Sequence, residues 1–173
     1  ILQMAEAVAY IHDLFIVHRD IKEAFLKRLA ERLENAVIGD PMDPNTSFGP
    51  MVSKRQMEIA LGYVEKGKAE GATLVCGGER ATEGELANGY FIKPTVFTNV
   101  TNDMAIAQEE IFGPVLCVMK YDDEDQAVKI ANDSIFGLGG GVWSEDIDRA
   151  RAVAGRMRTG TVWINDWHLL SEQ

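Results

Sequence analysis

Two adjacent carboxylates, Glu109 and Glu110, stand directly before an apolar run in the stretch AQEEIFGPVL. A carboxylate accepts two hydrogen bonds and so matches the vicinal hydroxyls of a ribose. Phe112 could cover one face of a flat heterocycle, and these groups together would form half of a nicotinamide riboside site. In the structural alternative, the acids finish a polar helix turn, Phe112 enters the core and Gly113-Pro114 sets a turn before a buried strand. The residues of this stretch alone favour the structural alternative.

The cysteines and histidines offer little other chemistry. Cys76 and Cys117 lie in apolar strand contexts, which are typical of buried structural thiols. No CxxC or Cys/His spacing indicates a metal site or a disulfide framework, so we expect no metal and a reducing, cytoplasmic compartment. His12, His18 and His168 are far apart and lack the spacing of a catalytic set, so we expect them at the surface or at strand ends.

Length and charge narrow the class of protein. A chain of 173 residues with 46% hydrophobic and 25% charged residues is long enough for one domain with a core. Seventeen basic and 27 acidic residues give a net charge of -10, which disfavours binding to nucleic acids and anionic membranes. No run reaches the roughly 18 apolar residues of a membrane span. Because position 1 is not Met, we expect a trimmed chain or a piece of a longer one.

Short apolar runs alternate with amphipathic patterns, which predicts an α/β fold with a largely parallel sheet flanked by helices. Capping residues are expected to open three helices: Asp20 with Glu23, Ser53 with Gln56, and Ser144. The first helix carries an apolar stripe of Ile21, Phe25, Leu29 and Leu33. Helices are predicted from residue 20 onward and over about 53–71, 123–132 and 144–157. Strands are predicted within residues 13–18, 72–78, 91–100, 115–121, 139–143 and 160–165.

Several long blocks occur in an order that resembles the catalytic domain of the aldehyde dehydrogenase superfamily. They are VHRDIKEAFLKRLAERLENAVIGDPMDPNTSFGPMVS, LGYVEKGKAEGATLVCGG, GYFIKPTVFTNVTNDMAIAQEEIFGPV and ANDSIFGLGGGVWSEDIDRARAVAGRMRTGTVWIN. The resemblance runs from about Phe15 to Asn165. It implies a catalytic-domain-like region over 15–165, an atypical N-terminal segment over 1–14 and a truncated C-terminal end over 166–173.

The resemblance also assigns site residues and a cofactor, NAD or NADP. It implies that Glu110 binds the ribose hydroxyls of the nicotinamide half, that Phe112 lies beside the nicotinamide, and that Gln56 lies near a cofactor ribose. Helix capping is an equal alternative for Gln56, and Glu109 is then expected to be a solvated acid at a helix end. The run GLGGG at 137–141 lacks the GxGxxG pattern of phosphate binding, which favours close packing of a strand.

Members of this family oxidise an aldehyde to a carboxylic acid through a cysteine thiohemiacetal, hydride transfer to nicotinamide and hydrolysis by a glutamate-activated water. The resemblance places that cysteine a little upstream of VHRDIKEAF, where this chain has Ala9 or a neighbour. The family's general base, oxyanion asparagine and cofactor domain lie further upstream. We therefore expect no activity from this chain alone, and weak cofactor binding because the pyrophosphate lacks its anchor.

The C-terminal end leaves further alternatives open. Trp167 is expected where the family lines its aldehyde entrance, and its indole could hold a cationic aldehyde, although covering the end of the core is favoured. A bare sheet edge predicts a homo-oligomer or association with a homologous chain. The alternative function is a noncatalytic assembly or binding module that pairs through this edge. It would be favoured if residues 1–14 formed a helix. A part of a split enzyme is a third possibility.

Overall fold

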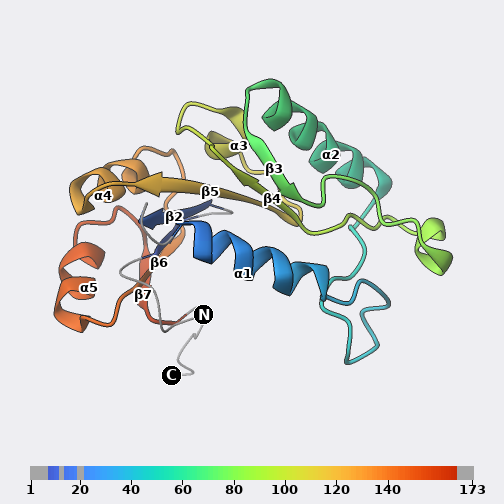
Figure 1. The fold of residues 1–173 in the computed structure, drawn as a ribbon, viewed down its shortest axis with the longest axis horizontal. Coiled ribbons are helices and arrows are strands. Elements are labelled where there is room, and N and C mark those ends of the chain that lie inside the picture. The colour runs from blue at the N-terminus through green and yellow to red at the C-terminus, as the bar shows by residue number, and fades with distance from the viewer. Residues whose placement is uncertain (1–7, 12–13, 19–21, 167–173) are drawn as a thin grey trace. The chain divides into compact units, whose positions relative to one another are not determined.

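The computed structural model describes residues 8–11, 14–18 and 22–166 (Figure 1). The chain divides into two compact units, which are described separately. One unit is Leu26–Cys117, and the other combines Ile1–Phe25 with Val118–Gln173. The boundary falls within a single strand, β5 (Val115–Tyr121), so this strand contributes residues to both units.

The unit Leu26–Cys117 holds three strands or parts of strands and the helices beside them. Strand β3 (Thr73–Cys76) pairs antiparallel with β4 (Thr95–Thr98), and β4 pairs parallel with β5, so that Thr95 lies opposite Val115. Helix α2 (Lys54–Ala69) packs on β3 and on the short helix α3 (Ala105–Gln108). A 3-10 helix, η2 (Gly84–Asn88), lies in the loop between β3 and β4, and most of α1 (Lys22–Glu34) belongs to this unit.

The other unit is a mixed sheet with two helices packed on it. Its strand order is β5, β2 (Leu14–His18), β1 (Val8–Ile11), β6 (Gly139–Trp143) and β7 (Thr161–Ile164). Strand β1 is antiparallel to both β2 and β6, whereas β6 and β7 are parallel. Helix α4 (Glu124–Asn132) packs on β1 and β2, and α5 (Ile147–Ala154) packs on β6 and β7.

The predicted α/β class, with helices flanking a sheet, is confirmed. Strands β4 and β5 are parallel and are joined by a crossover through α3, and β6 and β7 are parallel and are joined by a crossover through α5. The pairs β1–β2, β1–β6 and β3–β4 are antiparallel and qualify the prediction of a largely parallel sheet. Neighbouring strands run antiparallel where the chain returns without a crossover, as in the β1–β2 hairpin.

Local predictions hold best where a cap or a strand pattern is strong. Ser53 caps α2, Asp123 caps α4, and the strands at 115–121 and 139–143 are confirmed. The predicted cap at Ser144 is wrong, because Asp146 accepts the amide hydrogen bond of Arg149 and α5 begins at Ile147. Ser144 instead accepts a hydrogen bond from the amide of Asp146.

Near the N-terminus, a helix over residues 1–14 would have favoured the noncatalytic module, but Val8–Ile11 form a strand and Leu14 begins another. Residues 1–7 and 12–13 lie outside the described residues. Asp20 and Ile21 of the first predicted helix also lie outside them. Leu26 is the buried side chain of α1, and Phe25, Leu29 and Leu33 of the expected stripe are half-buried.

The core of the unit Leu26–Cys117 lies between α2 and strands β4 and β5. All four residues of β4 are buried, and Phe97 is fully inaccessible to solvent. Val64 of α2 is also fully buried, and Ile106 of α3 is 4% exposed. Burying side chains of this size contributes about 1.5–3 kcal/mol each. This packing fixes α2 against the segment that leads from α3 into β5.

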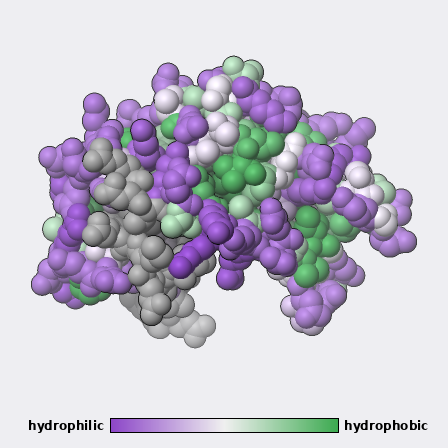
Figure 2. Space-filling model, viewed as in Figure 1, coloured by the Kyte–Doolittle hydropathy of each residue, from purple (hydrophilic) through white to green (hydrophobic). Residues whose placement is uncertain are grey.

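The surface is mainly hydrophilic on the face shown in Figure 2, with hydrophobic residues visible over β3 and β4. This agrees with a charged fraction of 25%. None of the helices in the described part of the chain is long and apolar enough to cross a membrane.

Candidate functional site

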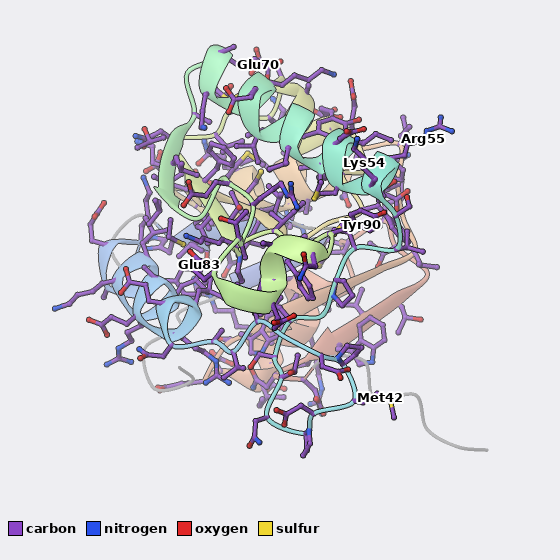
Figure 3. All side chains as sticks on the ribbon, turned by 90° about the vertical axis from the view of Figure 1, so that its right-hand side faces the viewer. Met42, Lys54, Arg55, Glu70, Glu83 and Tyr90 are labelled. Atoms are coloured by element: carbon purple, nitrogen blue, oxygen red, sulfur yellow. The ribbon has the colours of Figure 1, made fainter. Side chains whose placement is uncertain are left out.

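Helix α2 is the element that positions the candidate residues. It begins where the side chain of Ser53 accepts a hydrogen bond from the amide of Gln56, at 3.1 Å, and its C-terminal cap is Glu70. Gly71 follows with a φ of 97°, a conformation that glycine adopts without strain. Figure 3 labels Lys54 and Arg55 at one end of this helix and Glu70 at the other.

Gln56 connects α2 to the segment that carries the two acids. Its side-chain amide donates to the carbonyl of Ile111 at 3.1 Å and to the carbonyl of Phe112 at 3.2 Å. Only half of the predicted capping box therefore forms, since the Gln56 side chain contacts this segment and Ser53 supplies the cap. The structure brings Gln56 together with Phe112, whereas a contact of Gln56 with a cofactor remains a prediction.

Glu109 ends α3 and is bound by two groups of α2. Its Oε2 accepts a 2.7 Å hydrogen bond from the Tyr63 hydroxyl and lies 3.4 Å from Nζ of Lys66. The Tyr63 hydroxyl and then Lys66 hold the pKa of Glu109 below its ordinary value. The predicted position at a helix end is confirmed. Its side chain is also exposed, as predicted, but the two contacts with Tyr63 and Lys66 were not predicted.

Glu110 differs from its neighbour in having an exposed side chain. Within the described residues, no donor forms a hydrogen bond or an ion pair with its carboxylate. Both of its oxygens therefore keep their capacity to accept hydrogen bonds from an external ligand. An acid in this state suits a ligand that offers two neighbouring hydroxyls.

Phe112 is 69% exposed, so the alternative in which this ring enters the core is wrong. Ile111 takes the core position instead and is 1% exposed. The φ of Phe112 is 52°, and a non-glycine residue in this region costs on the order of 1–3 kcal/mol. Gln56 opposes that cost by donating to the carbonyls on both sides of the Phe112 α-carbon.

Gly113 allows the segment to pass close to α2. A Cβ at this position would lie 2.9 Å from the Cβ of Ala60, a distance that real side chains essentially never show. The next residue, Pro114, accepts a hydrogen bond from the amide of Thr95 at 2.8 Å and so joins the segment to β4. The Gly113-Pro114 step is thus a close helix contact followed by entry into β5, in agreement with the turn predicted there.

The thiols are unsuited to nucleophilic chemistry. Cys117 is fully buried, and its Sγ lies 3.3 Å from the carbonyl oxygen of Ile106. Cys76 is half-buried, and burial raises the pKa of its thiol. A raised pKa lowers the fraction of reactive thiolate at neutral pH. Cys117 therefore agrees with the predicted role of a buried structural thiol, whereas Cys76 is only half-buried.

The other predicted candidates lie apart from this segment or outside the described residues. Trp167 lies outside them, and the same is true of His12 and His168. In GLGGG, a Cβ at Gly139 would lie 2.9 Å from the ring of Trp163, which confirms close strand packing. No group of three His, Cys, Asp or Glu side chains within 8–11, 14–18 and 22–166 is placed to hold a metal.

Sequence reasoning missed Tyr63 and Lys66. Tyr63 follows Gln56 by seven residues, or two helical turns, so both side chains fall on the same face of α2. The seven-residue spacing can be read from the sequence, and it would place Tyr63 on the same helix face as the candidate Gln56. Its partner, Glu109, is 46 residues away from Tyr63, and no local pattern links the two.

Comparison with known proteins gives a consistent result. The sequence model of the Aldehyde dehydrogenase family matches residues 5–173. Betaine aldehyde dehydrogenase of Rhizobium johnstonii is 54% identical over 155 residues, and that of Brucella anthropi is 50% identical over 153 residues. Each match covers 88% of this chain and 31% of the relative.

A crystal structure of betaine aldehyde dehydrogenase from Staphylococcus aureus in complex with NAD+ is similar in fold. Its TM-score is 0.89 at 41% identity, and the match covers 91% of this chain and 31% of that one. The chain thus spans about a third of the length of the relatives that it matches.

Proposed function

Because the chain belongs to the aldehyde dehydrogenase family, we propose that it carries the part of such an enzyme that holds the nicotinamide riboside half of NAD or NADP. The observation that carries this proposal is the exposure of Glu110 and Phe112, two positions apart, on a segment that α2 holds at Glu109 and Ile111. NAD is favoured because the Staphylococcus aureus relative is in complex with NAD+.

The side chains fit that group in chemistry. The carboxylate of Glu110 has two oxygens without donors in the described chain, and a ribose offers two vicinal hydroxyls. Phe112 offers an exposed aromatic face to a flat ring, and such faces contact one another favourably. Gln56 lies at the same segment, and a contact between its amide oxygen and a ribose is part of the proposal.

When bound, the nicotinamide accepts a hydride from the substrate. The residues of this chain would hold the nicotinamide and its ribose in place. Glu110 would fix the ribose through two hydrogen bonds, and Phe112 would exclude water from one face of the ring. Holding a reacting group in one orientation lowers the entropic part of the barrier, so these contacts would act on rate as well as on affinity.

For the whole enzyme, we propose oxidation of a quaternary ammonium aldehyde to the carboxylic acid. The relatives at 49–54% identity bear the name betaine aldehyde dehydrogenase. Trp167 is the candidate contact for such a cation, through the attraction between a cation and an indole face, although covering the end of the core is the favoured role of this residue. The chain alone is expected to be inactive, because neither of its two cysteines is an exposed, activated thiol.

The compartment and the assembly belong to the proposal as well. Neither Cys76 nor Cys117 forms a disulfide, which suits a reducing cytoplasm. Strand β7 pairs with β6 on one side, and among the described strands nothing pairs with its other side. Such an edge favours pairing with another chain, which supports association of homologous chains.

The experiment is a titration of the isotope-labelled chain with β-nicotinamide mononucleotide, followed through backbone amide resonances. The mononucleotide contains the ribose and the ring without the adenosine half. Saturable shifts at Glu110 and Phe112 are expected, and shifts that avoid this segment would overturn the proposal. In parallel, betaine aldehyde and NAD+ should give no rise in NADH absorbance with this chain, and a rise would overturn the expected inactivity.

A further inference from the structure

One face of α2 contacts the segment 105–113 at both of its ends and in its middle. The residues of α2 that touch this segment recur every three or four positions, which places them in one stripe of the helix. The C-terminal end of the helix contacts the start of the segment, and its N-terminal half contacts the end. The contacting pairs are Glu70 with Ala105, Gly67 with Ile106, Tyr63 with Glu109, Gln56 with Ile111 and Phe112, and Ala60 with Gly113.

Within residues 109–113, two side chains are not held by the stripe. Glu109 is bound by Tyr63 and Lys66, Ile111 is buried, and Gly113 abuts the helix. Between them, Glu110 and Phe112 are exposed. Alternate residues of the segment therefore face α2, and the residues between them face away from it.

We infer that Tyr63 and Lys66 are positioning residues of the proposed ribose site, which set the direction of the Glu110 carboxylate by fixing Glu109. This inference rests on the proposed function. The peptide that joins Glu109 to Glu110 is planar, so with Glu109 anchored, the position of Glu110 depends on the two backbone torsions that flank this peptide. Gln56 fixes the carbonyl of Ile111 on the other side. Glu110 thus lies between two fixed points.

Lys66 also compensates the negative charge of Glu109. Glu109 and Glu110 are adjacent acids, and a nicotinamide nucleotide carries negative phosphate. Lys66 lies 3.4 Å from Glu109 and compensates its charge, so that only Glu110 presents an uncompensated carboxylate to the ligand. Lys66 also lies 4.9 Å from the centroid of the Tyr63 ring, which couples the two groups through a cation-π contact.

The test compares Tyr63→Phe and Lys66→Met with matched controls. Tyr63→Phe removes one hydroxyl, and its control is Tyr90→Phe, which removes the hydroxyl of an exposed tyrosine that no described side chain binds (Figure 3). Lys66→Met removes one positive charge, and its control is Lys68→Met, since Lys68 pairs with Glu65 of its own helix. Lys66→Arg keeps the charge and should restore the wild-type result.

Two quantities are measured in each variant, the affinity for β-nicotinamide mononucleotide and the backbone order of residues 109–112 from nitrogen-15 relaxation. Tyr63→Phe and Lys66→Met should each lower the affinity by about three- to tenfold, the effect of one lost hydrogen bond. The order parameter of Glu110 should fall in the same variants. Both controls and Lys66→Arg should match the wild type.

The outcomes separate this inference from the proposed function. Unchanged order at Glu110, or lowered order with unchanged affinity, would overturn the positioning role while leaving the ribose site intact. Equal losses in the controls would also overturn it. If the wild-type chain shows no binding at Glu110 and Phe112, the proposed function fails and the positioning role for a ribose fails with it. The relaxation data then still show whether the contact orders the segment.

Discussion

The side-chain amide nitrogen of Gln56 lies 3.2 Å from the carbonyl oxygen of Phe112, 56 residues further along the chain. The same nitrogen donates to the carbonyl of Ile111. These contacts hold the backbone where Phe112 adopts a φ of 52° and projects its ring toward solvent. A ring exposed at the expense of backbone strain, beside a carboxylate without a donor, is the arrangement expected of a ligand contact rather than of a core.

Replacing Gln56 with alanine should destabilise the chain. The change leaves two carbonyls of a partly buried segment without their donor, which costs about 1–3 kcal/mol. Urea unfolding followed by circular dichroism measures the difference. Arg55→Ala, one residue earlier on the exposed side of α2, is the control and should change the free energy of unfolding by less than about 0.5 kcal/mol. Equal effects of the two substitutions would contradict the role given to Gln56.

The approach of Gly113 to Ala60 can be tested by a double-mutant cycle. Gly113→Ala should lower the free energy of unfolding by about 1–3 kcal/mol, because its Cβ would lie 2.9 Å from that of Ala60. In an Ala60→Gly background the same change should cost less, with a coupling energy of about 1 kcal/mol or more. Gly62→Ala is the control. Nothing lies within 4 Å of a Cβ there, so it should stabilise the helix.

If Gly113→Ala lowers the free energy of unfolding equally with Ala60 and with Ala60→Gly, the close contact with Ala60 is not the reason that this position requires glycine. If Gly62→Ala instead destabilises the chain, an added methyl group on α2 is harmful even where space is open. The loss at Gly113 could then not be attributed to the contact with Ala60.

The elements themselves could be predicted better than the site. The type of Ser53 and its position before an amphipathic run predict a helix cap, and the apolar pattern of 115–121 predicts a strand. These features depend on neighbouring residues. The exposure of Phe112 and the hydrogen bond from Tyr63 to Glu109 depend on partners 46 to 56 residues away, which local periodicity does not encode. A pattern that predicts burial of an apolar run also cannot say that Ile111 is buried and Phe112 exposed.

The contact between Tyr63 and Glu109 should make stability depend on pH. Hydrogen bonding by Tyr63 lowers the pKa of Glu109 below its ordinary value of 4.5. The contribution of this hydrogen bond to stability should be fully present above the pKa of Glu109 in the unfolded chain, which is near 4.5. It should be lost as the pH falls through the lower pKa of Glu109 in the folded chain. The difference in the free energy of unfolding between wild type and Tyr63→Phe should therefore shrink below about pH 4.5.

At alkaline pH, the contribution of the same hydrogen bond to stability should fall as the pH rises, because Tyr63 then loses its proton. The hydrogen bond to Glu109 raises the pKa of Tyr63 above 10.0, so this contribution is present at neutral pH and is lost as the pH rises through the folded pKa. The assigned contact would be contradicted if the difference in the free energy of unfolding between wild type and Tyr63→Phe stayed constant across the acidic range. Tyr90→Phe should show no such dependence.

The two thiols should differ in reactivity in the folded chain. Cys117 is fully buried and should not react with a disulfide reagent at neutral pH. Cys76 is half-buried with a raised pKa, so it should react more slowly than a free small thiol. Both should react at once after unfolding, and Cys76→Ser should abolish the native-state reaction. A thiol that reacts faster than the small-molecule reference would indicate an activated nucleophile and contradict the expected inactivity.

The central claim is that the Glu110 carboxylate binds the two hydroxyls of the nicotinamide ribose. The most direct test measures the affinities of wild type and Glu110→Gln for β-nicotinamide mononucleotide and for its 2',3'-dideoxy analogue. Removal of the hydroxyls should weaken binding to the wild type by about tenfold or more, and should have little effect on Glu110→Gln, which has already lost the charged acceptor. If the hydroxyls matter equally to both proteins, Glu110 does not hold the ribose.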